Sequence, residues 1–260
     1  MWLYIGMRKK SKENKESQWF GYKKVNPEQK TRLVVDVFDS VASRYDLMND
    51  LMSGGVHRLW KNRFVRLMRP SPQKRLLDVA GGTGDIAFRY RGLAGDDAEI
   101  TVFDLNREML GVGKNRAIDR GYLNGFEWVK GNAEKLPFDD MSYHLYSISF
   151  GLRNVTRIDN ALAEACRVLT PGGQFFCLEF SHVKNDMLRK IYDEYSFNII
   201  PKIGELVAND RDSYQYLVES IRQFPKPDDL ARRIRAAGFD HVKTIPLTGG
   251  VAAIHIGSKF

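Results

Sequence analysis

The sequence predicts an α/β fold built on a mainly parallel, seven-stranded sheet that ends in an antiparallel hairpin. Short apolar runs alternate with helical stretches from residue 75 to residue 180, and a glycine-rich segment joins the first run to the helix after it. Alternation of this kind is typical of βαβ units, whose crossover helices keep neighbouring strands parallel. The last two apolar runs flank a Thr-Gly-Gly turn, which instead favours an antiparallel pair.

Residues 21–70 are predicted to form a helical preamble before the sheet. Within residues 27–50, apolar side chains recur every three or four positions, and Pro27 suits the first turn of a helix. Residues 56–68 repeat this spacing until Pro70 and Pro72 stop it. Two amphipathic helices are therefore expected here.

The rest of the chain supplies the sheet and the helices that cover it. Strands are expected at residues 75–80, 99–105, 126–131, 143–150, 174–180, 241–247 and 251–259, and helices at 85–92, 107–120 and 158–169. Residues 183–235 interrupt this rhythm with a helical insertion. Together with the preamble, the insertion is predicted to be a lid over the ligand edge of the sheet. We divide the chain into a tail, residues 1–20, and a single domain, residues 21–260.

Composition and charge exclude several classes of protein. Residues 1–30 hold eight Lys or Arg against three Glu, so +5 of the net charge of +8 lies there. We interpret residues 1–20 as a disordered basic tail, with weak attraction to an anionic membrane surface as the alternative. Because the positive charge is concentrated in this tail and does not form a patterned basic face, we predict no nucleic-acid partner. Cys166 and Cys177 lack the spacing of metal ligands, so no metal site is predicted.

The strongest chemical signal is the segment LLDVAGGTGD, in which a strand runs into Gly81, Gly82, Thr83 and Gly84 at the start of a helix. Glycines let a ligand approach the backbone closely, and a helix N-terminus offers free N–H groups to an anion. Asp104 ends the next strand, where a carboxylate can accept hydrogen bonds from ribose hydroxyls. The pattern predicts a site for an adenosine cofactor.

Three features favour S-adenosylmethionine over a dinucleotide, although Gly82, Gly84 and Ala87 also satisfy the dinucleotide pattern. The first is Asp78, placed to receive the ammonium group of the cofactor, with loop capping as the alternative role. The second is Asn132 with Ala133 after the third strand, where the adenine would lie. The third is the hairpin that ends the sheet.

At these residues the chain resembles Rossmann-like class I methyltransferases, and more narrowly the ubiquinone/menaquinone biosynthesis C-methyltransferase family. The narrower resemblance rests on YDLMNDLMSGGVHRLW, SFGLRNVT, RVLTPGGQFFCLEFS and ANDRDSYQYLVESI, and it covers about residues 20–260. It implies methyl transfer from S-adenosylmethionine to a ring carbon of a polyprenylated benzoquinol or naphthoquinol. In similar proteins the cofactor contacts fall on positions that here are Thr83, Asp104, Asn132, Ala133 and Ser149.

Four polar residues are candidates for the catalytic chemistry. Arg153 and Asn154 follow the fourth strand, which places them beside the ligand crevice. We expect Arg153 to stabilise the quinol phenolate or order a water, and Asn154 to orient the ring. Tyr45 is a candidate to hydrogen-bond the quinol, and His57 to accept its proton. The alternative for Arg153 is an ion pair with a lid carboxylate, and for Tyr45 and His57 a structural role.

Rival functions and partners stay open at the level of sequence. The glycine motif also fits an NAD-dependent oxidoreductase, and the fold also fits a catalytically weak scaffold of a quinone-biosynthesis complex. The expected partner is the polyprenylated quinol, whose tail the aromatic residues of the insertion, residues 192–200, are candidates to line. No membrane-spanning stretch is present, so we expect a cytoplasmic protein that can contact the inner face of the membrane peripherally. A homodimer is compatible with the sequence.

Overall fold

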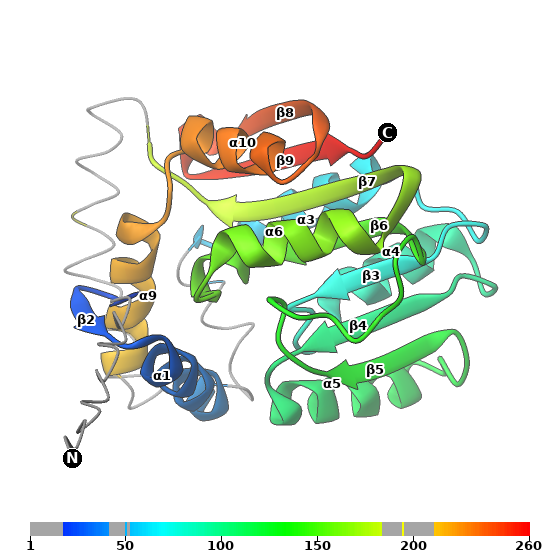
Figure 1. The fold of residues 1–260 in the computed structure, drawn as a ribbon. Coiled ribbons are helices and arrows are strands. Elements are labelled where there is room, and N and C mark those ends of the chain that lie inside the picture. Colours follow the sequence, from blue (N-terminus) through cyan, green and yellow to red (C-terminus); the bar gives the residue numbers. More distant parts are fainter. Residues whose placement is uncertain (1–17, 42–49, 51–52, 184–193, 195–210) are drawn as a thin grey trace, which may run out of the picture.

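The computed structural model describes residues 18–41, 50, 53–183, 194 and 211–260. Its centre is a seven-stranded sheet (Figure 1) in the order β5-β4-β3-β6-β7-β9-β8. The strands are β3 (Leu76–Val79), β4 (Ile100–Asp104), β5 (Phe126–Lys130), β6 (Tyr143–Ser149), β7 (Leu169–Phe180), β8 (Asp240–Leu247) and β9 (Ala252–Ser258). Strands β3 to β7 pair in parallel, whereas β9 runs antiparallel to β7 and β8. The predicted mainly parallel sheet with a terminal antiparallel hairpin is confirmed.

Helices cover both faces of this sheet, because successive strand residues point to opposite faces and both sets are apolar. In β3, Leu76 packs with α3 (His57–Leu67), α4 (Asp85–Ala94) and α5 (Arg107–Asp119), whereas Leu77 packs with α6 (Ile158–Val168) and α10 (Pro227–Ala236). The helices predicted at residues 85–92, 107–120 and 158–169 are therefore present.

The helices α1 (Pro27–Val41) and α9 (Arg211–Gln223) lie beyond the carboxyl ends of the parallel strands (Figure 1). They are the parts of the predicted lid that the structure places at the ligand edge. The other described parts lie elsewhere: α3 packs with α4 and β7, and α10 packs with α6, β8 and β9. Tyr45 and residues 195–200 lie outside the described residues. No described helix is both long and apolar enough to cross a membrane.

A small N-terminal hairpin was not predicted. Its strands are β1 (Gln18–Phe20) and β2 (Lys23–Val25), which pair antiparallel around Gly21. The ring of Phe20 stacks on that of Tyr216 in α9 at 4.1 Å between centroids. Placing the end of the tail at residue 20 was therefore wrong for residues 18–20, because packing against α9 orders them; residues 1–17 lie outside the described residues.

Candidate functional site

The glycine segment forms the loop between β3 and α4, and its backbone can adopt this path only with small residues. A Cβ on Gly81 would lie 2.6 Å from a methyl group of Val102 and 2.9 Å from the carbonyl oxygen of Asp78. Gly82 has a φ of 52°, in the left-handed region that favours glycine. Gly81, Gly82 and Thr83 line a cavity at the carboxyl ends of the strands, whereas Gly84 caps α4 and is not among the lining residues.

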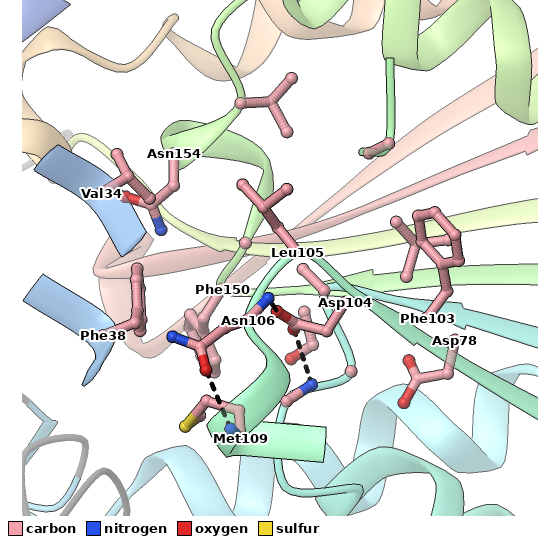
Figure 2. Close-up of a pocket in the computed structure, with 18 of the residues that line it drawn as sticks. Val34, Phe38, Asp78, Phe103, Asp104, Leu105, Asn106, Met109, Phe150 and Asn154 are labelled. Carbon is pink, nitrogen blue, oxygen red and sulfur yellow. Dashed lines mark hydrogen bonds between the residues drawn. The ribbon is translucent and has the colours of Figure 1, made fainter. Parts of the chain in front are cut away.

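Asp104, at the end of β4, is fixed by two backbone donors. The N–H of Gly82 donates to its Oδ2 at 2.8 Å, and the N–H of Asn106 donates to its Oδ1 at 2.8 Å (Figure 2). Burial raises the pKa of Asp104 to about 6, and these hydrogen bonds act in the opposite direction. Each carboxylate oxygen keeps a second lone pair, so Asp104 can accept hydrogen bonds from two adjacent hydroxyl groups of a ligand.

Asp78 is a buried carboxyl group at the end of β3 with half of its hydrogen-bonding capacity unused. The hydroxyl of Ser147 donates to its Oδ1 at 2.6 Å, but Oδ2 has no partner among the described residues. Burial raises the pKa of Asp78 to about 7; the hydrogen bond from Ser147 opposes this rise, and the nearby carboxylates of Asp104 and Asp85 add to it. An orphaned buried carboxylate oxygen is costly unless a ligand cation pairs with it.

The remaining sequence-predicted cofactor residues also line this cavity. Asn132 and Ala133 follow β5, and the Oδ1 of Asn132 accepts from the backbone N–H of Glu134 at 2.9 Å. Ser149 ends β6, and its buried Oγ has no partner among the described residues. The structure therefore brings together Asp78, Gly81, Gly82, Thr83, Asp104, Asn132, Ala133 and Ser149 in one cavity, which holds about 1040 Å³ of empty space including a part open to solvent.

These residues fit S-adenosylmethionine. The unpartnered Oδ2 of Asp78 suits an ammonium group, Asp104 suits the ribose hydroxyls, and the backbone of Gly81 and Gly82 lines the cavity, where a ligand can approach it. Such a cofactor supplies an electrophilic methyl group on a sulfonium sulfur, so the protein needs only to align a nucleophile and exclude water.

The other side of the cavity is mostly apolar and comes largely from α1. Val34, Val35 and Phe38 line it, together with Phe150 after β6. Figure 2 shows Val34 and Phe38 on the side opposite Asp78. We call these four residues the apolar part of the cavity. Sequence reasoning placed Val34 and Phe38 on the apolar face of a helix but did not assign them to a site, because periodicity does not say what a helix covers.

Two residues of the cavity have strained backbones. Ala80, after β3, has a φ of 51°, and Phe150, after β6, has a φ of 56°. Such conformations are uncommon for residues other than glycine and cost about 1–3 kcal/mol each. The two loops touch so closely that a Cβ on Gly151 would lie 2.3 Å from that of Ala80. Strain of this kind is often found at ligand sites, which agrees with the position of the cavity.

Arg153 lies next to the cavity but is not one of its lining residues. Its side chain is 1% exposed and forms an ion pair with Glu179 of β7, at 2.9 Å from Nη1 to Oε2. The same nitrogen donates to the carbonyl oxygen of Phe150 at 2.6 Å. An ion pair was the alternative role considered for Arg153, but the carboxylate comes from the sheet and not from the lid. Its role in phenolate stabilisation stays a prediction.

His57 is likewise buried and outside the set of lining residues. Its Nε2 lies 2.8 Å from Oδ1 of Asp50, and its Nδ1 has no partner among the described residues. Burial, followed by the charge of Lys61, lowers the pKa of His57. The imidazole is therefore neutral near neutral pH, and its role as a proton acceptor stays a prediction.

Asn154 lines the cavity and is held by α9. The hydroxyl of Tyr216 donates to its Oδ1 at 2.9 Å, while its Nδ2 is buried and has no partner among the described residues. Burial raises the pKa of Tyr216, so its hydroxyl stays a donor throughout the usual pH range. Tyr216 thus fixes the side-chain amide of Asn154 so that the amide N–H groups are available to a ligand. The sequence did not predict this contact, because the two residues are far apart in the chain.

Replacing Tyr216 by Phe should slow methyl transfer by about tenfold, the weight of one neutral hydrogen bond, while cofactor affinity stays unchanged. The measurement is turnover and cofactor affinity in the parent, the Tyr216→Phe and Asn154→Ala variants, and the double variant. If Tyr216 acts through Asn154, the double variant will be no slower than Asn154→Ala alone. Fully additive losses would contradict this link.

Comparisons with known proteins agree with the geometry. Residues 23–259 match the model of the ubiE/COQ5 methyltransferase family. The chain is 55% identical over 242 residues to the ubiquinone/menaquinone biosynthesis C-methyltransferase UbiE of Brucella canis, covering 92% of this chain and 90% of that protein. The corresponding protein of Brucella anthropi is 54% identical, with 92% of both chains covered.

Two solved structures are similar in fold alone. A SAM-dependent methyltransferase of Thermotoga maritima superposes with a TM-score of 0.61 at 18% identity, covering 87% of this chain and all of that one. One from Aquifex aeolicus gives a TM-score of 0.55 at 14% identity and covers 91% of this chain and all of the other. The fold is that of class I methyltransferases, and the chain belongs to the ubiE/COQ5 methyltransferase family.

Proposed function

We propose that this protein transfers the methyl group of S-adenosylmethionine to a ring carbon of a polyprenylated quinol. The acceptor is a benzoquinol of the 2-methoxy-6-polyprenyl-1,4-benzoquinol type, a demethylmenaquinol, or both. The observation that carries the proposal is one cavity lined on one side by Asp78 and Asp104, which suit the cofactor's polar groups, and on the other by the apolar part, which suits an aromatic ring. The Brucella relatives, which are ubiquinone/menaquinone biosynthesis C-methyltransferases, support the same reaction.

The residues of the site suggest how the reaction is assisted. A ring carbon becomes nucleophilic when the neighbouring hydroxyl loses its proton, so groups that stabilise the resulting phenolate raise the rate. The apolar part, Val34, Val35, Phe38 and Phe150, excludes water and strengthens such interactions. Asn154 can donate to a quinol oxygen through its Nδ2. The protein's contribution is thus alignment, exclusion of water and charge stabilisation.

The test is anaerobic incubation with methyl-labelled S-adenosylmethionine and two reduced short-tailed acceptors, one benzoquinol and one naphthoquinol. Mass spectrometry of the rings should show label on a ring carbon, and the labelled acceptor identifies the quinone pathway. Cofactor binding without label on either ring would favour a scaffold role. Binding of NAD in place of S-adenosylmethionine would favour an oxidoreductase.

A peripheral contact with the membrane is part of this proposal, because a polyprenyl tail partitions into lipid. The N-terminal hairpin suits such a contact, since Trp19 is 44% and Tyr22 is 49% exposed and both lie beside Lys23 and Lys24. The ammonium of Lys24 lies 5.2 Å from the ring of Trp19. Aromatic rings next to lysines are typical of surfaces that meet an anionic lipid headgroup region.

The double variant Trp19→Ser/Tyr22→Ser should therefore bind weakly to vesicles. We expect its cosedimentation with vesicles containing anionic phosphatidylglycerol to fall severalfold relative to the parent, with turnover on a soluble short-tailed quinol retained. The matched control is Leu123→Ser, which removes an apolar side chain that is 76% exposed after α5. Equal losses in both variants, or a parent protein that does not cosediment, would contradict the hairpin contact.

A further inference from the structure

Lys61 of α3 supplies the one cation among the residues that line the cavity in the described part of the chain. Its side chain is 3% exposed, although lysine is almost never fully buried unless paired. Its Nζ lies 2.8 Å from Oδ2 of Asp85 and 5.8 Å from the centre of the Phe150 ring, which belongs to the apolar part of the cavity. The ammonium group is therefore held against the side where the quinol ring is proposed to lie.

The carboxylate of Asp85 does not cancel this charge, because it is shared with a second cation. The Nε of Arg89 lies 2.8 Å from Oδ1 of Asp85, and Arg89 is not among the lining residues. Burial acts to raise the pKa of Asp85, but Lys61 and Arg89 outweigh it and keep that pKa below its ordinary value. Two cations around one carboxylate leave one positive charge in excess on this side of the cavity.

The other groups near Lys61 leave this excess in place. His57, one turn before it on α3, is neutral because burial and then Lys61 itself lower its pKa. Arg153, the cation that sequence reasoning assigned to the reaction, has its guanidinium bonded to Glu179 and the carbonyl of Phe150. Asp78 and Asp104 belong to the polar residues proposed for the cofactor.

We propose that Lys61 is a catalytic residue whose ammonium group binds the quinol oxygen that ionises during methyl transfer. This inference rests on the proposed quinol acceptor. The hydroxyl gives its proton to water, and the phenolate makes the ring carbon beside it nucleophilic. That carbon forms a bond to the methyl group while the carbon–sulfur bond breaks and its electrons stay on sulfur. The ring then loses the proton of the methylated carbon to water, which restores the aromatic ring as a phenolate, and the phenolate oxygen takes a proton back from water to give the methylated quinol. A buried ammonium stabilises the negative charge that develops on the oxygen.

A test independent of turnover uses a tailed nitrophenol, whose absorbance reports its ionisation. Bound to the parent protein, its pKa should fall by about one unit, because a cation within contact distance favours the phenolate. Lys114→Met, which removes an exposed lysine of α5 outside the lining residues, is the matched control and should retain this shift. Arg89→Met should reduce the shift, because Asp85 is then left to neutralise Lys61 alone. Lys61→Met should abolish it, and Lys61→Arg should restore part of it. An unchanged shift in Lys61→Met would overturn the proposal whether or not a quinol is the natural acceptor.

Turnover then tests the catalytic role. We expect Lys61→Met to slow ring methylation by on the order of 100-fold, the effect of removing a charge-stabilising donor, with cofactor affinity within about threefold of the parent. The reduction in rate caused by Lys61→Met should become smaller across a series of quinols with increasingly acidic hydroxyls, since these ionise without stabilisation by the Lys61 ammonium group. A loss that is equal across the series, or equal in Lys114→Met, would assign Lys61 a structural role only. A parent that labels none of the quinols while the nitrophenol shift persists would refute the proposed acceptor and leave the cation site in place.

Discussion

Replacing Asp78 by Asn is expected to weaken S-adenosylmethionine binding by on the order of 100-fold at about pH 8, where the parent carboxylate is ionised. The change removes the charge that we expect to pair with the cofactor's ammonium group but keeps the size of the side chain and an acceptor for the hydroxyl of Ser147. The measurement is titration calorimetry of both proteins. Affinity within about threefold of the parent would contradict the assignment of Asp78.

The pH dependence of binding follows from the same group. Burial raises the pKa of Asp78 to about 7, so the parent loses this negative charge as the pH falls through neutrality. We expect the dissociation constant of the parent to rise between about pH 8 and pH 6 and that of Asp78→Asn to change much less. Asp104, whose pKa burial raises to about 6, accounts for a remaining dependence at the acidic end.

As the pH rises, the contribution of Asp78 to the stability of the folded protein should fall, whereas its contribution to cofactor binding should rise. A carboxyl with a raised pKa in the folded protein stabilises the fold when protonated, and this contribution is lost as the pH rises from about 4 to about 7. Because Asn cannot ionise, the cofactor-free Asp78→Asn variant should unfold at a higher temperature than the parent above about pH 7, with a difference that vanishes towards about pH 4. Thermal unfolding at several pH values checks this, and a difference that grows at acidic pH would contradict it.

Separate replacement of Arg153 or Glu179 should destabilise the protein strongly. Each leaves its partner as a buried charge, which typically costs about 3–5 kcal/mol. Joint replacement, Arg153→Met/Glu179→Leu, removes both charges and should recover most of that loss. Denaturant unfolding measures the free energy of unfolding of the two single variants and of the double variant. Equal destabilisation in the single and double variants would contradict this explanation, because the loss would then not come from an unpaired buried charge.

The same double variant decides whether Arg153 acts in the reaction. Since its guanidinium is bonded to Glu179 and to the carbonyl of Phe150, we expect turnover to return with stability, to within about tenfold of the parent. A folded double variant that remains on the order of 100-fold slower would support the phenolate role predicted from the sequence.

The sheet and the polar residues of the cavity could be predicted because their signals are local. The four buried positions of β3 and the glycines after them are adjacent in the chain, so strand, turn and helix follow from one short segment. Parallel pairing then brings Asp78, Asp104 and Ser149 to the same edge, since the carboxyl ends of parallel strands meet there.

The missed or misassigned features depend on pairings between distant residues. Periodicity predicted α3, but it could not say that Lys61 on that helix would meet Asp85 after the glycine loop. Arg153 was predicted to lie beside the ligand crevice, but its partner Glu179 could not be predicted, because it lies in a strand that reads as apolar. The N-terminal hairpin was missed because each strand has three residues and is ordered by contacts with α9.

The N-terminal hairpin, which precedes α1 in the chain, packs against α9 from far along the sequence, and this contact affects the order of folding. The backbone N–H of Tyr22 donates to Oε2 of Glu219, 197 positions away, and the Phe20 ring rests on Tyr216. The parallel strands pair over much shorter separations, so they can form before α9 has been synthesised. The hairpin and α1 should therefore close last and, having few contacts with the sheet, open first. We therefore expect the residence time of a long-tailed quinol to depend on local unfolding of the hairpin and α1, while the sheet that lines the proposed cofactor site stays intact.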